Sequence, residues 1–246
     1  MSYRVCLVTG VGDATGTALV KRFASEGYQV AMIARDQKRL ARLEKELEGV
    51  HSFVCDLSDL QQLESTVNKV LDRFGKVDVL VHNAVSHTFG RFMDAAPEEL
   101  EQNFRVNTTA LLYLARLVTP AMVKAKQGAV IVTGNTASLR GVPNYALFAP
   151  TKAAQRVLCE SLARDLGPQK VHVGYVTIDG AIKVNWIEAA GDKTPDWLIP
   201  PDDWPWPEQS FYVQPDAIAD EVFHTAHQHE SAWSFETVIR PFAEKW

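Results

Sequence analysis

Short apolar segments alternate with longer segments of helical periodicity along most of the chain, and this alternation constrains the fold more than any other feature. The short segments are apolar on both faces, which is typical of parallel strands covered by helices on both sides of a sheet. We expect strands near 5–9, 28–34, 52–55, 77–82, 129–133, 171–177 and 234–239. The intervening helices are expected near 15–27, 36–48, 59–74, 98–126, 146–166 and 215–228. The sequence therefore predicts an α/β fold with a doubly wound parallel sheet of about seven strands.

Length and composition narrow the class of protein further. The 246 residues carry a net charge of −5 and no internal repeat or linker, so we expect one domain over 1–246. With no run of Lys or Arg longer than a pair, a nucleic-acid-binding function is not expected. No window approaches the ~18 apolar residues that a membrane span requires, so no such span is expected, and the N-terminal apolar run is too short for a secretory signal.

The three cysteines, Cys6, Cys55 and Cys159, are widely spaced and lie in no zinc-binding pattern. We therefore expect no metal site. An odd number of scattered cysteines favours a reduced, cytoplasmic protein.

One stretch departs from the alternation. Between Val184 and Pro215 the periodicity stops, and six prolines are mixed with four tryptophans, at 186, 197, 204 and 206. A long, aromatic-rich segment without regular structure favours a functional lid over about 184–214. The alternative is a surface flap that packs on its own core or on a neighbouring subunit.

A glycine-rich turn follows the first expected strand. Its sequence is Thr9-Gly10-Val11-Gly12-Asp13-Ala14-Thr15-Gly16, and a helix is expected to begin near Thr17. Glycines allow backbone N–H groups to approach a pyrophosphate at the positive end of a helix. We therefore expect a dinucleotide site that includes Gly10, Gly12, Asp13, Thr15 and Gly16. A tight strand-to-helix turn without a ligand is the alternative.

The turn resembles the fingerprint TGxxxGxG of the short-chain dehydrogenase/reductase family. Thr9, Gly10 and Gly16 match it, whereas Ala14 stands in place of the middle glycine and requires a negative φ. The resemblance implies a Rossmann-type fold that binds a nicotinamide dinucleotide.

Two later motifs also resemble this family. Cys55-Asp56-Leu57 resembles the element whose Asp contacts the adenine, so Asp56 and Leu57 are expected at the cofactor; alternatively, Asp56 and Asp59 cap the next helix. His82-Asn83-Ala84-Val85 resembles the motif NNAG, which implies that Asn83 and Ala84 lie beside the cofactor and that Asn83 holds the strand ends together.

A third motif, Asp179-Gly180-Ala181-Ile182, resembles the family's PG-containing loop, with Asp179 in place of the proline. The resemblance implies that Ile182 presents its backbone to the nicotinamide carboxamide.

The residues after the second strand bear on the choice of cofactor. Ala34 stands where NAD-preferring members of the family have an acidic residue, and Arg35 follows it. A guanidinium suits a 2′-phosphate, so NADP is favoured. Asp36 could serve NAD instead, although a cap of the helix that starts with Gln37 is the favoured role for it.

The catalytic motif YxxxK is altered. Lys152 matches its lysine, but the tyrosine falls on Phe148 and the catalytic serine falls on Asn135. A phenylalanine cannot donate a proton, whereas Asn135 can still polarise a carbonyl and Lys152 can still bind the nicotinamide ribose. Asn107 resembles the family's helix Asn that carries a proton-relay water; a purely structural role is the alternative.

Several groups could replace the missing phenol. Tyr145 lies seven residues before Lys152, on the same helical face if the helix includes both. His82, His87 and Ser138 are rival proton donors, and water relayed through Asn107 and Lys152 is a further route.

The sequence thus predicts a divergent, NADP-preferring oxidoreductase that acts on a small, largely apolar carbonyl, alcohol or activated double bond. The alternative is a catalytically inactive dinucleotide-binding protein, either a sensor or a structural partner. The resemblance also implies a homodimer or homotetramer, formed through the helices at 98–126 and 146–166.

Overall fold

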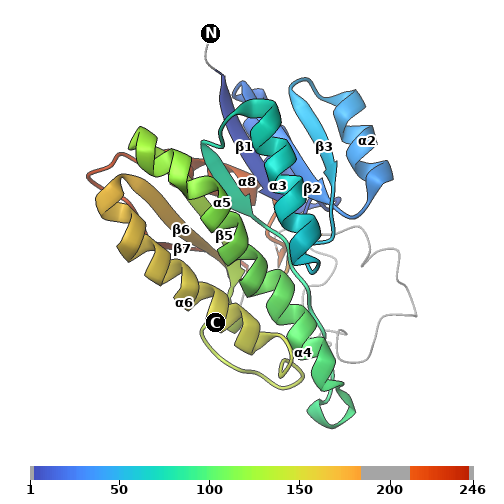
Figure 1. The fold of residues 1–246 in the computed structure, drawn as a ribbon. Coiled ribbons are helices and arrows are strands. Elements are labelled where there is room, and N and C mark those ends of the chain that lie inside the picture. The colour runs from blue at the N-terminus through green and yellow to red at the C-terminus, as the bar shows by residue number, and fades with distance from the viewer. Residues whose placement is uncertain (1–2, 184–210, 244–246) are drawn as a thin grey trace.

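A parallel sheet of seven strands forms the centre of the structure, a computed structural model that describes residues 3–183 and 211–243 (Figure 1). The strands follow the order β3-β2-β1-β4-β5-β6-β7. The chain moves outward from β1 to β3 on one side of the sheet and from β4 to β7 on the other, so the strand order reverses between β1 and β4. The predicted doubly wound parallel sheet is therefore confirmed. The strands are β1 (Arg4–Thr9), β2 (Tyr28–Ala34), β3 (Val50–Val54), β4 (Val79–His82), β5 (Gly128–Asn135), β6 (Val171–Ile178) and β7 (Glu236–Ile239).

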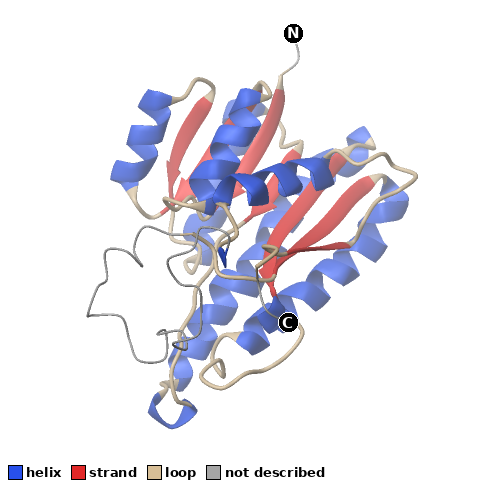
Figure 2. Ribbon diagram, turned by 180° about the vertical axis from the view of Figure 1, so that it is seen from behind, coloured by secondary structure: helices blue, strands red, loops and turns tan. Residues whose placement is uncertain are grey.

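Helices cover both faces of this sheet (Figures 1 and 2). One face packs against α3 (Leu60–Phe74), α5 (Ala110–Ala125) and α6 (Ala149–Leu166). The other packs against α1 (Thr15–Ser25), α2 (Gln37–Glu46) and α8 (Pro215–Ala226). A further helix, α4 (Pro97–Phe104), is joined to α5 by a turn of π-helix, η2 (Arg105–Thr109). Short 3₁₀ turns lie at η1 (Phe92–Asp94), η3 (Thr136–Ser138) and η4 (Gly167–Gln169).

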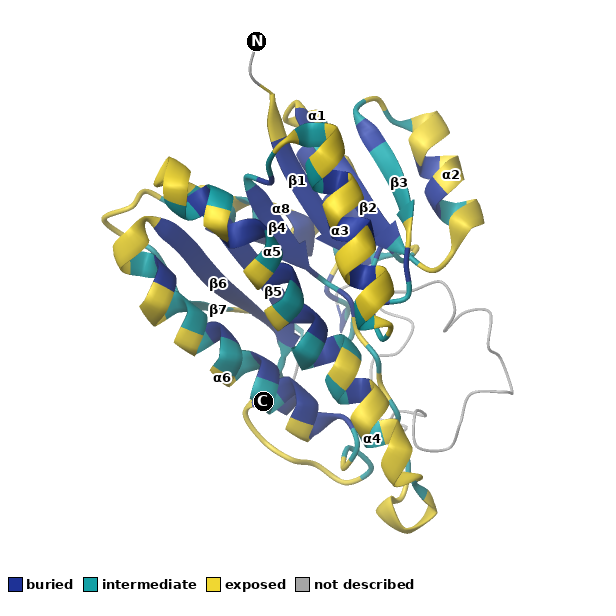
Figure 3. Ribbon diagram, in the orientation of Figure 1, coloured by how far each residue is buried: buried dark blue, intermediate teal, exposed yellow. Residues whose placement is uncertain are grey.

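The strand sequences explain this two-sided packing. In β1, Val5 and Leu7 point to the core beneath α3 and α5, and Cys6 and Val8 point to the core beneath α1. All four side chains are fully buried, and the sheet is buried through most of its area (Figure 3). Because both faces are covered, the central strands β1, β4 and β5 are mostly apolar rather than alternating with polar residues.

The helical stretch Pro97–Ala125 bears on the expectation that no segment spans a membrane. By length and composition alone it is long and apolar enough to cross one. In the structure, Leu111, Leu114 and Val118 of this stretch are fully buried, and they belong to the core cluster beneath the sheet. Its apolar composition is therefore explained by packing, because α5 covers the middle of the sheet.

The largest difference in element boundaries concerns α6. The helix expected to begin near 146 begins at Ala149. Pro150 lies in its first turn, where a proline is tolerated. Further inside a helix it would lack an N–H donor and its ring would clash with the carbonyl group four residues earlier, so the helix does not extend back to Tyr145.

Candidate functional site

A cavity of about 1020 Å³ lies at the C-terminal ends of β1, β2 and β4, where the strand order reverses. This is the place at which doubly wound sheets bind ligands. Nearly every residue predicted to bind the cofactor lines it: Gly10, Gly12, Asp13, Thr15, Gly16, Arg35, Asp56, Leu57, Asn83, Ala84 and Ile182. Lys152 is the exception, because it is absent from the described residues that line the cavity.

The glycine turn leaves no room for side chains at two of its positions. Gly10 has a φ of +72°, and a Cβ there would lie 2.4 Å from the Cα of Ala84. A Cβ on Gly16 would lie 2.5 Å from the carbonyl oxygen of Gly10, whereas one on Gly12 would meet nothing within 4 Å. Ala14 has a φ of −100°, which confirms the expected negative value. Gly10 and Gly16 therefore bring the turn close to β4 and α1.

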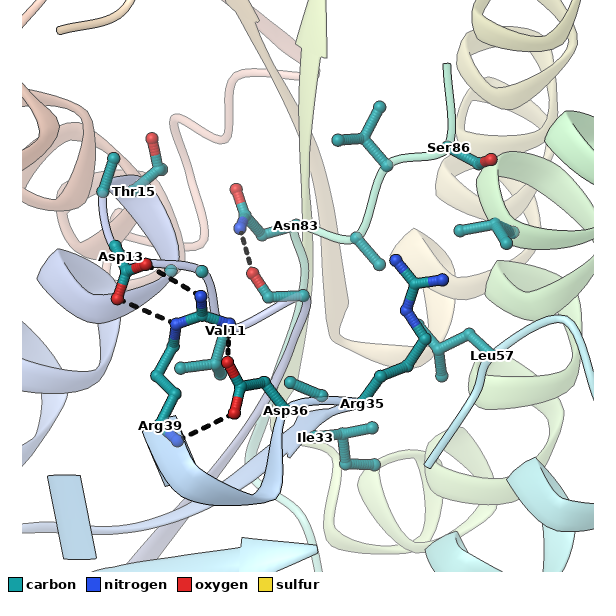
Figure 4. A pocket seen from close by; sticks show the side chains of 18 of the residues that line it. Val11, Asp13, Thr15, Ile33, Arg35, Asp36, Arg39, Leu57, Asn83 and Ser86 are labelled. Atoms are coloured by element: carbon teal, nitrogen blue, oxygen red, sulfur yellow. Dashed lines mark hydrogen bonds and ion pairs between the residues drawn. The ribbon is translucent and has the colours of Figure 1, made fainter. Parts of the chain in front are cut away.

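Hydrogen bonds hold this turn against its neighbouring strands. The Gly10 N–H donates to the carbonyl oxygen of Ile33 over 3.0 Å, and Asn83 Nδ2 donates to the carbonyl oxygen of Gly10 over 2.8 Å. Thr133 Oγ1 in turn donates to Asn83 Oδ1 over 3.0 Å. Asn83 thus links the glycine turn to β4 and β5 at the floor of the cavity (Figure 4).

Carboxylates after β2 and β3 are occupied locally. Asp36 accepts a hydrogen bond of 3.0 Å from the Arg39 N–H and caps α2. Asp56 accepts from the Ser58 N–H and hydroxyl, over 3.0 and 2.8 Å, and Asp59 caps α3. Asp36 and Asp59 are therefore helix caps, as the alternative interpretations of the sequence had it. Asp56 does not cap the helix but lines the cavity.

Two arginines at this end of the cavity differ in their partners. Arg39 donates from Nε and Nη2 to the two carboxylate oxygens of Asp13, each over 2.8 Å, and these bonds hold the pKa of Asp13 below its usual value. Arg35 is exposed, and it makes no hydrogen bond or ion pair with any residue that the structure describes (Figure 4). Arg35 is therefore the guanidinium that an incoming anion can reach without displacing a partner.

The side chain of Lys152, which the sequence predicts to be catalytic, points into the protein interior. Lys152 is 3% exposed, and its Nζ donates to the carbonyl oxygen of Thr133 over 3.2 Å and to Gln155 Oε1. Gln155 Nε2 donates to the carbonyl oxygen of Asn107 over 2.6 Å. Burial lowers the pKa of Lys152 to about 8. The Gln155 amide thus connects the two groups between which a water relay was expected.

The Asn107 side chain is bound on every side. Its Oδ1 accepts from the Ser86 N–H over 2.8 Å, and its Nδ2 donates to the Ser86 carbonyl oxygen and to Thr151 Oγ1, each over 2.8 Å. Asn107 lies in the π-helical turn between α4 and α5. The Asn107 amide therefore links the loop after β4 to α6. These bonds support the alternative that Asn107 has a structural role.

Phe148 lies in an aromatic cluster. Its ring is 3% exposed and packs edge-on to Phe89, with centroids 5.2 Å apart, and 5.9 Å from the ring of Tyr145. Tyr145 precedes α6, so the expected alignment with Lys152 on one helical face does not form. Burial raises the pKa of Tyr145, which makes its phenol a weaker acid.

The rival proton donors occupy different environments. His82 is fully buried, its Nδ1 lies 3.0 Å from Thr9 Oγ1, and burial together with the nearby Lys152 charge lowers its pKa to about 3. Ser138 donates to the backbone carbonyl of Asn135 over 2.7 Å. His87 lines the cavity and stacks on Phe89 with centroids 5.1 Å apart. Of these three, His87 is the donor that the cavity exposes to a ligand.

Asn135 ends β5 and has a hydrogen bond still to make. Its Oδ1 is buried and has no partner among the residues that the structure describes. Asn135 is not among the described residues that line the cavity.

The two described ends of the predicted lid lie side by side. Ile182 pairs with Val213, and the Lys183 N–H donates to the Val213 carbonyl oxygen over 3.1 Å. Ile182, Lys183 and Pro215 also line the cavity. The segment between them, 184–210, lies outside the described residues, so its predicted role as a lid stays a prediction.

Two site residues were missed in the sequence, and each had a detectable signal. Gln155 is a polar residue three positions after Lys152 and thus on the same face of a helix. Arg39 lies three residues after the helix cap Asp36 and is therefore on the same side of α2 as Asp36. This side faces the glycine turn, where Arg39 bonds Asp13.

Comparisons with known proteins agree with this geometry. A family model described as short chain dehydrogenase matches residues 4–190. L-xylulose reductase of Bos taurus is 31% identical over 174 residues, or 70% of each chain. Dehydrogenase/reductase SDR family member 4 of Mus musculus is 30% identical over 200 residues, which cover 77% of this chain and 71% of the mouse protein. A metagenomic short-chain oxidoreductase, solved in complex with NADP, superposes with a TM-score of 0.80 at 28% identity and covers 98% of both chains.

Proposed function

The chain belongs to the short-chain dehydrogenase family of oxidoreductases, and on that premise we propose that it is an NADP(H)-dependent member that needs no phenolic acid. Its substrate is a small, largely apolar molecule with a carbonyl, an alcohol or an activated double bond. The observation that carries this proposal is the contrast between an open dinucleotide cavity and the buried ring of Phe148.

The residues of the cavity fit a dinucleotide phosphate. Gly10 and Gly16 leave the space that a Cβ would fill, and the N-terminus of α1 lies beside them, as a pyrophosphate requires. Arg35 supports NADP over NAD, because its guanidinium is available to a 2′-phosphate while Asp36 is engaged as a helix cap. When bound, NADP(H) supplies the hydride chemistry.

The polar groups of the catalytic half support a reaction with little acid catalysis. Lys152 is bonded to Thr133 and Gln155, and Phe148 has no proton to give. Asn135 ends β5 at the position of the family's catalytic serine, and its amide can orient a substrate that reaches it. Reduction of an activated alkene or an iminium, in which the carbon acceptor is already electron-poor, fits this set better than reduction of a simple ketone.

A non-catalytic, dinucleotide-binding role is the second candidate. It is favoured by the inward bonding of Lys152, which leaves the cavity without a lysine from α6. Such a protein would bind NADPH and transfer nothing.

The remaining parts of the proposal concern the surroundings of the site. We propose that 184–214 closes over the substrate, since both of its described ends pair at the cavity edge. We further propose a cytoplasmic homodimer or homotetramer. Leu112 of α5 and Val157 of α6 are exposed apolar side chains on the two helices expected to meet a second subunit.

Deuterium transfer distinguishes the two candidates. NADPH deuterated at C4 is incubated with the protein and with simple ketones, activated enones and cyclic iminium ions, and the products are examined by mass spectrometry. We expect deuterium in the enone or iminium products and much less in the ketone products. Binding of NADPH without transfer to any acceptor would contradict the enzymatic proposal and support the second candidate. The control is Gly10→Ala, whose added Cβ would lie 2.4 Å from the Ala84 backbone beside the cavity and should abolish transfer.

A further inference from the structure

The Asp13–Arg39 ion pair lies on the rim of the proposed cofactor cavity. Besides its two 2.8 Å bonds to Asp13, Arg39 reaches Asp36 Oδ2 with Nη1 over 3.3 Å. Arg42 Nη2 also bonds Asp13 Oδ1, over 3.2 Å. Figure 4 shows the Arg39 guanidinium between the two carboxylates, while Arg35 is drawn without any such bond. Asp13, Arg35, Asp36 and Arg39 all line the same cavity.

This ion pair is not needed to shape either of the elements that it joins. The glycine turn is fixed by the Gly10 N–H on Ile33 and by Thr17 Oγ1, which donates to the Gly12 carbonyl oxygen over 2.6 Å. Helix α2 is capped by Asp36 through the backbone of Arg39. The Asp13 side chain is 57% exposed and that of Arg39 24% exposed, so an ion pair of this kind contributes little to stability.

Carboxylates and guanidiniums both line this end of the cavity. The lining includes three carboxylates, on Asp13, Asp36 and Asp56, and two guanidiniums, on Arg35 and Arg39, while Arg42 contacts Asp13 from outside the lining. A phosphate monoester carries a charge of about −1.5 to −2 at pH 7, nearly twice that of a carboxylate. It can therefore compete with Asp13 for Arg39, whereas the 2′-hydroxyl of NADH cannot.

We infer that Arg39 is a second ligand of the 2′-phosphate and that Asp13 is its internal competitor, which lowers the preference of the protein for NADPH over NADH. The inference rests on the proposed function, since it assumes that the cavity holds a nicotinamide dinucleotide. Asp13 thereby acts against the 2′-phosphate rather than as a direct cofactor contact. Arg35 provides the first contact, and Arg39 joins it by exchanging the carboxylate for the phosphate.

The test is the ratio of the dissociation constants for NADPH and NADH, measured by fluorescence titration. Asp13→Asn removes the competing carboxylate and leaves Arg39 with only its ion pair to Asp36 among the described residues. We expect it to tighten NADPH binding about three- to tenfold while NADH changes by less than about twofold. Arg39→Gln should weaken NADPH binding by about three- to tenfold with the same small effect on NADH. In the double variant, Asp13→Asn should give no gain over Arg39→Gln alone.

Arg42→Gln is the matched control, because Arg42 contacts the same carboxylate but is not among the described residues that line the cavity. It should leave the ratio within about twofold of the original value. The inference is wrong if Asp13→Asn leaves the ratio unchanged, or if its gain persists without Arg39. Should Asp13→Asn fail to fold, Arg39→Gln decides the matter, since an unchanged ratio there overturns the inference too. If the unaltered protein binds neither dinucleotide, the proposed function itself fails; normal NADPH binding with an unaltered ratio defeats this inference alone.

Discussion

The polar groups near the glycine turn and those near α6 differ in how far they are buried. Around the glycine turn and α2, charged side chains such as Arg35, Asp13 and Arg39 lie on the rim of the cavity. Around α5 and α6, Lys152 and Gln155 are buried and bonded to each other. The half of the site at the glycine turn can exchange its partners for a ligand, whereas in the half at α6 Lys152 and Gln155 already have partners within the protein.

On the proposed function, cofactor binding and proton transfer depend on separate sets of residues of one sheet. The dinucleotide half depends on backbone space and on rim charges, which α6 does not supply. The half proposed for proton transfer lies at α6. Here the buried ring of Phe148 and the Gln155 amide stand where a proton donor would be needed. The following predictions test this separation, beginning with the largest expected effect.

Closing the glycine turn should disable the dinucleotide half. Gly10→Ala introduces a Cβ at a φ of +72° and 2.4 Å from the Ala84 backbone. We expect a loss of about 3 kcal/mol or more in the free energy of unfolding and at least about a hundredfold weaker NADPH binding. Gly12→Ala, where a Cβ meets nothing within 4 Å, is the control. Denaturant titration and isothermal calorimetry measure both; equal effects of the two substitutions would contradict the assignment.

Removing the amide of Gln155 should destabilise the catalytic half without affecting the cofactor. Gln155→Leu leaves Lys152 Nζ and the Asn107 carbonyl oxygen each without one buried partner. We expect a loss of about 1–3 kcal/mol in the free energy of unfolding and little change in NADPH affinity. Gln169→Leu, on an exposed residue bonded to the Asp165 carbonyl oxygen, should have a negligible effect. A large change in NADPH affinity would show that the two halves are coupled.

Arg35→Ala should weaken NADPH binding by about 1 kcal/mol, which is roughly a fivefold change, and should leave NADH binding nearly unchanged. The reason is that the unpartnered guanidinium faces the cavity. Lys38→Ala removes a nearby exposed charge and provides the control. Fluorescence titration with both dinucleotides measures the effect, and an unchanged NADPH affinity would remove Arg35 from the site.

His82 should make folding sensitive to mild acid. Burial lowers its pKa to about 3 in the folded protein, so between pH 6.5 and 3 the unfolded chain binds a proton that the folded chain does not. Stability from this group is therefore lost as the pH falls, by about 0.7 kcal/mol between pH 7 and pH 6. His82→Asn should reduce the slope of unfolding free energy against pH, and His229→Asn, on the surface, should not. Equal slopes for all three proteins would show that His82 takes up a proton in the folded state.

The sequence was most informative where the physical signal is local. Apolar strand patterns and the spacing of Gly10 and Gly16 predicted the sheet and the cavity, because both depend on neighbouring residues. The bonds of Arg39 to Asp13 and of Gln155 to Asn107 join residues 26 and 48 positions apart, so they depend on how the elements pack. The helix expected to align Tyr145 with Lys152 failed for a local reason, the proline in the first turn of α6.

The most direct test of the account measures NADPH affinity and ketone reduction together in one pair of proteins. Phe148→Tyr combined with Asn135→Ser should raise turnover of simple ketones by about 10²–10⁴, because a general acid is restored, while the dissociation constant of NADPH changes by less than about twofold. Tyr145→Phe in both backgrounds is the control for a substitute phenol, and it should change neither quantity. Brisk ketone reduction by the unaltered protein, unaffected by the loss of Tyr145, would contradict the claim that Phe148 has removed the acid step.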